Sequence, residues 1–335
     1  MSEAPPRHVP VLLAEVLNAL EPQPGSLFID ATFGAGGYAR ALIERGADVV
    51  GVDRDPSAIR AGDDLVERSD GRLRLIESRF GDLETVARDL RLKAPDGVVF
   101  DVGVSSMQFD EAQRGFSLRL DAPLDMRMGG GGRTAADILN EEDEATIADI
   151  LYHFGEERAS RRIARAIVAD RKDAPVASTH ELAELVARVA PARRGERTHP
   201  ATRTFQALRI AVNDELTELL RGLQAAERLL KPGGRLAAVT FHSLEDRIVK
   251  QFLASRSSRR QPDSRRLPGE PAARPSTFAV PRRQPIGPTQ AEILANPRSH
   301  SAKLRFGIRL EAPASPPDPA LVGLTRLPAK PRRSR

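Results

Sequence analysis

A glycine-rich loop and three aspartates are the residues of this sequence whose types and spacing best suit ligand chemistry. Asp30 ends an apolar run and is followed at once by the loop at 32–37, which contains three glycines. Glycine has no Cβ, so such a loop can turn tightly and let its backbone approach a ligand. Asp53 and Asp101 end two further apolar runs. Because open α/β sheets bind ligands beyond the carboxyl ends of their strands, we expect the three acids to share one crevice.

The loop by itself fits two cofactor classes. Gly34, Gly36 and Ala39 have the dinucleotide-binding spacing, and Asp53 lies about the expected distance beyond them. An NAD-dependent oxidoreductase is therefore one interpretation. Asp30 favours S-adenosylmethionine, because a carboxylate before the loop can hold the methionine ammonium group but would repel a pyrophosphate. Each acid taken singly can also be an ordinary helix cap.

Alternating strand and helix patterns position these residues. Helical patterns at 38–45 and 56–67 separate apolar runs in the first hundred residues, which predicts a parallel sheet with right-handed crossovers. The predicted strands lie at 27–30, 48–53, 73–76, 97–101, 235–241 and 302–310. The fold class is predicted as α/β, a Rossmann-like doubly wound sheet of the class I methyltransferase type with an inserted helical subdomain.

The middle of the chain carries helical patterns without a convincing strand. One helix is predicted from Ser178, with Glu181 completing a capping box, and another along the apolar stripe from 205 to 223. The predicted domains are a first core part at 1–109, the inserted subdomain at 110–204, a second core part at 205–311 and a flexible basic tail at 312–335.

The composition excludes several kinds of chemistry. The 335 residues include no cysteine, which excludes disulfides, a Cys nucleophile and a Cys-ligated cluster for radical chemistry. The six histidines show no ligand spacing, so no metal site is predicted. No apolar run reaches about 18 residues and no signal peptide is recognisable, so we expect a cytoplasmic protein without a membrane span.

The positive charge is concentrated near the C-terminus. The net charge is +5, but residues from Arg256 onward hold 17 Lys or Arg against 5 Asp or Glu. Such an arm suits a nucleic-acid phosphate backbone, and it equally suits a disordered solubilising tail.

Ten short segments together resemble the ribosomal small-subunit RNA methyltransferase H family, also called MraW. They are HVPVLL at 8–13, TFGAGG at 32–37, DRDP at 53–56, DVGVSS at 101–106 with Gln108, RGFS at 114–117, PLDMRM at 123–128, GEER at 155–158, HPATRTFQ at 199–206, FHSLEDR at 241–247 and NPR at 296–298. Two departures are visible, because Tyr38 stands where the family usually has His, and Gly129 where an Asp commonly follows PLDMRM.

The resemblance implies N4-methylation of a cytidine in the decoding region of 16S rRNA, with S-adenosylmethionine as the methyl donor. The partner implied is 16S rRNA within the small ribosomal subunit, and a homodimer is left open. Alternatives are a methyltransferase acting on another nucleic acid or a protein, and a non-catalytic RNA-binding assembly factor. The cofactor contacts implied are Gly36, Gly37, Tyr38, Asp53, Phe80, Asp101 and Gln108; the residues themselves add Asp30 and Gly34.

Other polar residues are candidates for catalysis or RNA contact. Asp101 is the first candidate to accept a hydrogen bond or proton from the cytosine amine. Arg203, Arg209 and Asn213 precede or lie on the helix near 205 and are candidates for RNA binding, although a solvated helix face explains them too. His242 is a weaker candidate, because Ser243 with Asp246 resembles a helix N-cap. Arginines at 158, 162 and 165 form a basic stripe, either an RNA face or plain surface.

Overall fold

The computed structural model describes residues 10–103, 111–118, 120–191, 198–257 and 275–328. The chain forms two compact units. Unit 1 comprises Met1–Gly103 and Glu218–Leu324, and unit 2 comprises Val104–Thr217 and Thr325–Arg335. The second crossing between the units therefore lies at 217–218, beyond the boundary predicted at 204. No helix among the described residues is both long enough and apolar enough to cross a membrane.

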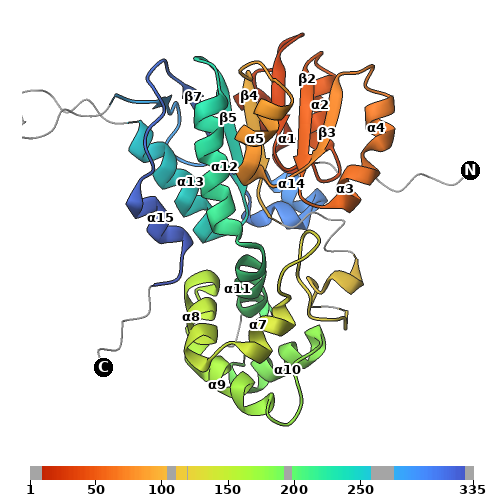
Figure 1. Cartoon of the computed structure of the whole chain (residues 1–335), viewed down its shortest axis with the longest axis vertical. Helices are drawn as coiled ribbons and strands as arrows, with labels where there is room; N and C mark the ends of the chain where they lie inside the picture. The colour runs from red at the N-terminus through yellow and green to blue at the C-terminus, as the bar shows by residue number, and fades with distance from the viewer. Residues whose placement is uncertain (1–9, 104–110, 119, 192–197, 258–274, 329–335) are drawn as a thin grey trace, which may run out of the picture. The chain divides into compact units, whose positions relative to one another are not determined.

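Unit 1 is built on a seven-stranded sheet with the order β3-β2-β1-β4-β5-β7-β6 (Figure 1). The first five strands of that order run parallel, whereas β7 pairs antiparallel with both β5 and β6. The strands are β1 (Leu27–Asp30), β2 (Asp48–Asp53), β3 (Leu73–Glu77), β4 (Gly97–Asp101), β5 (Arg235–Thr240), β6 (Phe278–Ala279) and β7 (Lys303–Arg309). The predicted parallel sheet is confirmed. β6 was not predicted, because two residues are too few to give a periodic signal.

Helices cover both faces of this sheet, which explains why its central strands are continuous apolar runs. The helices α1 (Leu13–Leu20) and α2 (Gly37–Ile43) share one buried cluster with Phe28, Val49 and Val99. On the other face, Gly222 of α12 (Glu215–Leu229) lies against Phe100. Unit 1 also contains α3 (Pro56–Ala61), α4 (Asp63–Glu67), a 3-10 turn (Phe80–Asp82), α5 (Leu83–Asp89), α13 (Ser243–Arg256), α14 (Gln290–Ala295) and a second 3-10 turn (Pro297–Ser301).

Unit 2 is helical in its described part. Its helices are α7 (Ala135–Glu141), α8 (Glu144–Gly155), α9 (Ser160–Asp170), α10 (Thr179–Val189) and α11 (Thr202–Asn213), with a 3-10 turn at Ala112–Arg114. The predicted capping box is confirmed: Ser178 accepts from the Glu181 N–H, and the Glu181 side chain accepts from the Ser178 N–H. The inserted segment therefore has the helical character that the sequence indicated.

Three predicted elements were wrong in detail. The helix expected along 205–223 is two helices, α11 and α12, separated at Asp214, whose φ of 51° is left-handed. Aspartate adopts this conformation more readily than most residues, and the apolar stripe continues across the break. The helix expected at 56–67 is likewise split into α3 and α4 at Gly62. The tail expected to be frayed contains α15 (Pro319–Thr325), because Leu321 is buried.

A buried polar cluster fixes the end of α13. The Glu227 carboxylate accepts from Arg256 Nε at 2.6 Å and from the Thr277 hydroxyl at 2.7 Å. The Thr277 N–H also donates to the Arg256 carbonyl at 2.9 Å. Residues 256 and 277 are thus held together at backbone hydrogen-bond distance.

Candidate functional site

The three predicted acids lie at the ends of β1, β2 and β4, where the strand order reverses direction. In the parallel register Asp30 pairs with Gly51 and with Val99. Side chains alternate along a strand, so Asp30, Asp53 and Asp101 all leave the same face of the sheet, the face covered by α2. A crevice beyond adjacent strands at such a reversal is where doubly wound sheets bind ligands. The strand register therefore brings the three acids together on one face of the sheet, as the sequence predicted.

The glycine loop links β1 to α2 and is held by one of these acids. The Gly34 N–H donates to Asp53 Oδ2 at 2.8 Å. Gly34 and Gly36 have φ of 51° and 72°, in the left-handed region that favours glycine. A Cβ on Gly36 would stand 2.7 Å from the Phe33 ring, so the loop has no room for a side chain there. The backbone of the loop is thus placed beside the carboxylates by packing that only glycine permits.

Asp30 is completely buried and weakly supported. It accepts from the Thr32 N–H at 3.3 Å and from the Ala39 N–H at 3.2 Å. Burial raises the pKa of Asp30 to about 7, and the nearby Asp53 adds to this rise, whereas the two hydrogen bonds oppose it. Burial also raises the pKa of Asp53. With a pKa of about 7, Asp30 is therefore expected to ionise fully when a positive group binds beside it.

Asp101 carries the most telling feature of the site. Burial raises its pKa to about 8, with further contributions from the negative charges of Asp30 and Glu245. Its Oδ1 is buried and has no hydrogen-bond partner among the described residues. A buried oxygen without a partner costs free energy, so its retention points to a ligand that supplies the missing donor or charge.

S-adenosylmethionine has the charges that these residues lack. Its sulfonium and ammonium groups are cationic, and its ribose hydroxyls donate hydrogen bonds to carboxylates such as Asp53. A dinucleotide would instead bring an anionic pyrophosphate to neighbouring strand ends that each carry an acid. The residues present therefore fit the methyl donor, and the electrostatics disfavour the oxidoreductase alternative.

The glycine loop is supported from behind by the residues that precede α1. The Pro10 ring lies against Gly37, where a Cβ would come within 2.1 Å of Pro10 Cγ. The buried Tyr38 hydroxyl donates to the Val11 carbonyl, and the Leu12 N–H donates to Glu292 Oε1 at 2.7 Å. Because its side chain is used in this support, Tyr38 can contact a cofactor in the loop chiefly through its backbone.

Of the two remaining candidates for cofactor contact, the structure describes Phe80 but not Gln108. Phe80 follows β3 on the 3-10 turn, half-buried, and its ring packs edge-on against Phe100 with centroids 5.7 Å apart. It lies beyond β3, the neighbour of the strand that ends in Asp53. Gln108, with Ser105 and Ser106, lies outside the described residues.

Glu245 was not predicted as part of the site. It is fully buried on α13, beyond the end of β5, and its charge helps to raise the pKa of Asp101. Its carboxylate accepts from the Phe241 N–H at 2.8 Å and the His242 N–H at 3.2 Å. The sequence FHSLEDR reads as a polar helix start, and only the fold reveals that this acid faces the interior.

The expected N-cap at Ser243 was wrong by one residue. His242 is the N-cap of α13, and its Nδ1 accepts from the Glu245 N–H at 3.4 Å. The His242 side chain is only 10% exposed, and its Nε2 lies 2.9 Å from Glu245 Oε1. These contacts explain His242 as a helix cap; its direct contact with substrate stays a prediction.

The three RNA candidates around α11 occupy different environments. Arg203 is exposed, and its Nη1 donates to the Glu156 carbonyl at 3.3 Å. Arg209 makes a forked ion pair with Glu215, at 2.8 and 2.9 Å, across the break at Asp214. Asn213 is 1% exposed. Arg209 and Asn213 therefore do not lie on a solvated helix face, and Arg203 alone of the three is exposed; contact of these residues with RNA stays a prediction.

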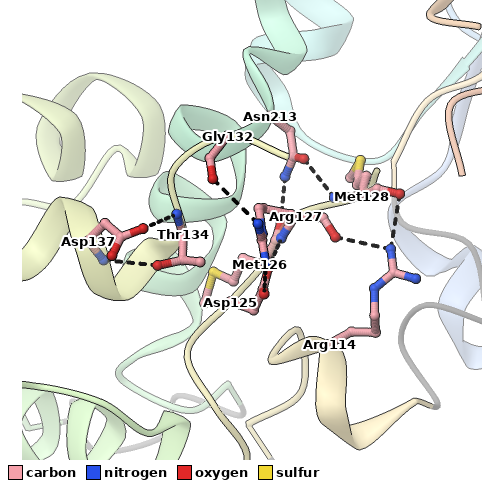
Figure 2. Close-up of polar contacts among 9 residues, drawn as sticks. All are labelled: Arg114, Asp125, Met126, Arg127, Met128, Gly132, Thr134, Asp137 and Asn213. Atoms are coloured by element: carbon pink, nitrogen blue, oxygen red, sulfur yellow. Dashed lines mark hydrogen bonds and ion pairs between the residues drawn. The ribbon is translucent and has the colours of Figure 1, made fainter. Parts of the chain in front are cut away.

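Asn213 instead anchors the PLDMRM loop, as Figure 2 shows. Its amide accepts from the Met128 N–H at 2.8 Å and donates to the Met126 carbonyl at 2.7 Å. Arg114 donates to the carbonyls of residues 127 and 128, both at 3.0 Å. The buried Met126 has a left-handed φ of 63°, so this loop is held in a conformation that the chain would not adopt alone.

The family model and highly similar curated proteins agree on the family of this chain. The model of the MraW methylase family matches residues 6–309. A protein of Methylocella silvestris named ribosomal RNA small subunit methyltransferase H is 60% identical over 332 residues, covering 99% of this chain and 96% of its own. One of the same name from Methylobacterium sp. strain 4-46 is 57% identical and covers 100% of both chains. A solved rRNA methylase from Streptococcus thermophilus is 11% identical with a TM-score of 0.41, covering 93% of this chain and 100% of its own.

Proposed function

This chain belongs to the MraW methylase family, and from that premise we propose that it methylates the N4 amine of a cytidine in the decoding region of small-subunit rRNA. The methyl donor is S-adenosylmethionine. The names of full-length relatives at 60% and 57% identity support small-subunit rRNA as the substrate. The cytidine, its N4 atom and the decoding region follow from the family resemblance.

One observation carries the proposal. Asp101 ends β4 at the strand reversal and presents a buried Oδ1 without a hydrogen-bond partner among the described residues. A carboxylate at that position can serve the cationic donor and an amine acceptor. An oxygen that only capped a helix would instead have a backbone N–H as its partner.

The chemistry demanded of the chain is modest. When bound, S-adenosylmethionine supplies an electrophilic methyl group whose sulfur is a good leaving group. The cytosine amine is a weak nucleophile because its lone pair is delocalised into the ring. Asp101 accepts a hydrogen bond from N4–H, which orients the lone pair toward the methyl carbon. The bound donor would supply the methyl group and leave as the neutral thioether, and the Asp101 carboxylate or water would accept the proton that the amine loses.

The other site residues hold the donor in place. Asp30 would pair with its ammonium group, and Asp53 would accept hydrogen bonds from its ribose hydroxyls. The backbone of Gly34, Gly36, Gly37 and Tyr38 would line the loop side of the donor, and Phe80 would contact its adenine ring. Gln108 is proposed to contact the cofactor as the family pattern implies.

The test is methyl transfer to small ribosomal subunits that lack cytidine methylation. The protein is incubated with labelled S-adenosylmethionine and the subunits, and the modified nucleoside is identified after digestion. N4-methylcytidine at one decoding-region site supports the proposal. Transfer to another base, or only to DNA or peptide, contradicts it. Naked rRNA as a parallel substrate shows whether the assembled subunit is required.

A further inference from the structure

The helix α9 of unit 2 exposes a row of arginines. Arg158 precedes the helix, and Arg161, Arg162 and Arg165 lie on it; all four are exposed. Their spacing of three or four residues places them on one side of the helix. The opposite side, which includes Ile163 and Ile167, is buried. These four arginines are called the basic face below.

The acids packed around the basic face neutralise little of it. Glu144 of α8 lies 3.7 Å from Arg165, with both side chains largely exposed. Glu157 is buried and turned to the Ala159 N–H at 2.7 Å. Among the described residues, Arg158, Arg161 and Arg162 make no hydrogen bond or ion pair. The face therefore keeps most of its charge.

The charges of α9 are ordered against the stability of the helix. Arg161 and Arg162 stand in its first turn and Asp170 in its last, whereas the helix dipole favours acids at the start and bases at the end. Neighbouring like charges four residues apart destabilise it further. The adjacent helices α8 and α10 follow the favourable order, with Glu144 and Glu181 in their first turns. A placement that costs stability in one helix, beside two that obey the rule, indicates a functional reason.

An exposed aromatic ring lies near the end of α8, and a basic residue contacts the residue that follows this helix. Arg203 reaches the carbonyl of Glu156, two residues before Arg158. Tyr152 lies one helical turn before Glu156 and is 56% exposed. Figure 1 shows α8 and α9 packed together in this unit. The Tyr152 ring packs edge-on against His153, with centroids 5.0 Å apart, and an exposed tyrosine ring offers a face on which an unpaired base can stack.

We propose that the basic face, with Arg203 and Tyr152, binds the phosphate backbone of the RNA substrate and one of its unpaired bases. The identity of the RNA rests on the proposed function. Charge complementarity selects the occupant, because RNA carries one negative charge per nucleotide and arginine pairs with phosphate through two parallel hydrogen bonds. A single-stranded or looped segment fits best, since stacking needs a base that is free of its own neighbours.

The experiment removes three charges from the basic face and three from elsewhere. The test variant is Arg161→Gln/Arg162→Gln/Arg165→Gln in the full chain. The control is Arg68→Gln/Arg74→Gln/Arg88→Gln, which removes the same charge from exposed positions of unit 1. Binding to a small-subunit decoding-region RNA is measured by fluorescence anisotropy across a salt series. Thermal unfolding and S-adenosylmethionine affinity check that both variants are folded.

The test variant is expected to bind RNA roughly tenfold or more weakly at about 0.1 M salt, with a salt slope shallower by about two. Tyr152→Ala is expected to weaken binding by about fivefold or more with an unchanged slope. Equal losses in the test and control variants, or wild-type binding by the test variant, would overturn the proposal. So would selective loss of binding to anionic phosphatidylglycerol vesicles with RNA binding intact, which would assign the face to a membrane surface.

The assay separates this proposal from the function on which it rests. If wild type methylates the subunit while the test variant binds and methylates equally well, the basic face fails and the function stands. If wild type binds RNA through the basic face but transfers no methyl group to rRNA, the proposed function fails and the face stands.

Discussion

The two units crowd like charges in opposite ways. In unit 1 the carboxylates of Asp30, Asp53 and Asp101 converge in the protein interior, where water and salt screen them little. In unit 2 the arginines of α9 stand in solvent, where salt screens charges beyond about 10 Å. The raised pKa values of Asp30, about 7, and Asp101, about 8, mean that the charge of these two acids depends on the ligand. The exposed arginines carry a fixed charge, so the strength with which they attract an anionic ligand depends on the salt concentration.

This difference separates the kinds of ligand that each region suits. A site whose charge appears only with its partner favours a small cation that fits it closely. A permanently charged surface attracts a polyanion of many shapes and releases it as salt rises. Perturbing each unit should therefore give effects of different size and different dependence on conditions.

The largest effect is expected for Asp101→Asn. The variant keeps the shape of the side chain but removes its ability to take a proton, so the rate of methyl transfer should fall about 10²–10⁴-fold. Single-turnover kinetics at saturating S-adenosylmethionine measure this. Glu77→Gln, at an exposed acid ending β3, is the matched control and should leave the rate unchanged. A wild-type rate for Asp101→Asn would mean that Asp101 takes no part in the chemistry.

The affinity for S-adenosylmethionine is expected to decrease as the pH is lowered, by roughly tenfold or more from about pH 8 to pH 6. The cation needs ionised acids, and the raised pKa values of Asp101, about 8, and Asp30, about 7, mean that both are protonated at the lower pH. Calorimetry in two buffers of different ionisation enthalpy should detect proton release on binding. A pH-independent affinity without proton release would contradict the view that the buried acids of unit 1 become charged only when the cofactor binds.

The stability of the ligand-free protein should depend on the same groups with the opposite sign. A raised pKa in the folded state means that folding retains protons, so this contribution is present at low pH and is lost as pH rises through about 7 and 8. Asp30→Asn should therefore stabilise the ligand-free protein at about pH 9 more than at about pH 5. Urea unfolding at both pH values provides the measurement, and equal effects at both would show that Asp30 is ionised throughout.

Asn213→Ala is expected to lower the free energy of unfolding by roughly 3 kcal/mol, because it leaves the Met128 N–H and the Met126 carbonyl buried without their partner. Urea denaturation provides the measurement. Gln251→Ala, at an exposed position of α13, should change stability little. A change as small as that of the control would show that the PLDMRM loop finds other support.

The smallest effect is expected for Tyr38→Phe, which removes only the hydroxyl that donates to Val11. A loss of about 1 kcal/mol follows from one buried hydrogen bond. Tyr152→Phe, at an exposed ring, should leave the melting temperature unchanged. If both variants melt as wild type does, the support behind the glycine loop is packing by Pro10 and not this hydrogen bond.

The strand-end acids could be predicted because their signals are local. Each follows an apolar run within a few residues, and the glycines between Asp30 and α2 need no distant contact to be recognised. The sheet itself follows from the same alternation of strand and helix. The capping box at Ser178 was recognisable for a similar reason, since its two partners lie three residues apart.

What the sequence did not reveal depends on contacts between distant residues. Asn213 reads as part of a polar helix face, but its partner Met128 lies 85 positions away, which turns its amide inward. The break at Asp214 leaves the apolar periodicity intact, so the sequence pattern gives no sign of it. Glu245 is placed inside by the position of β5 against β4, which no local spacing specifies.

The hydrogen bond between Arg256 and Thr277 has a consequence for how this chain can be lengthened. The two ends of the intervening segment are tied together by the fold, so the core does not depend on the segment to bring them there. Closing a longer loop costs only slowly more entropy, on the order of 0.6 kcal/mol for each doubling of length. An affinity tag or a fluorescent domain inserted between Arg256 and Thr277 is therefore expected to leave the sheet intact.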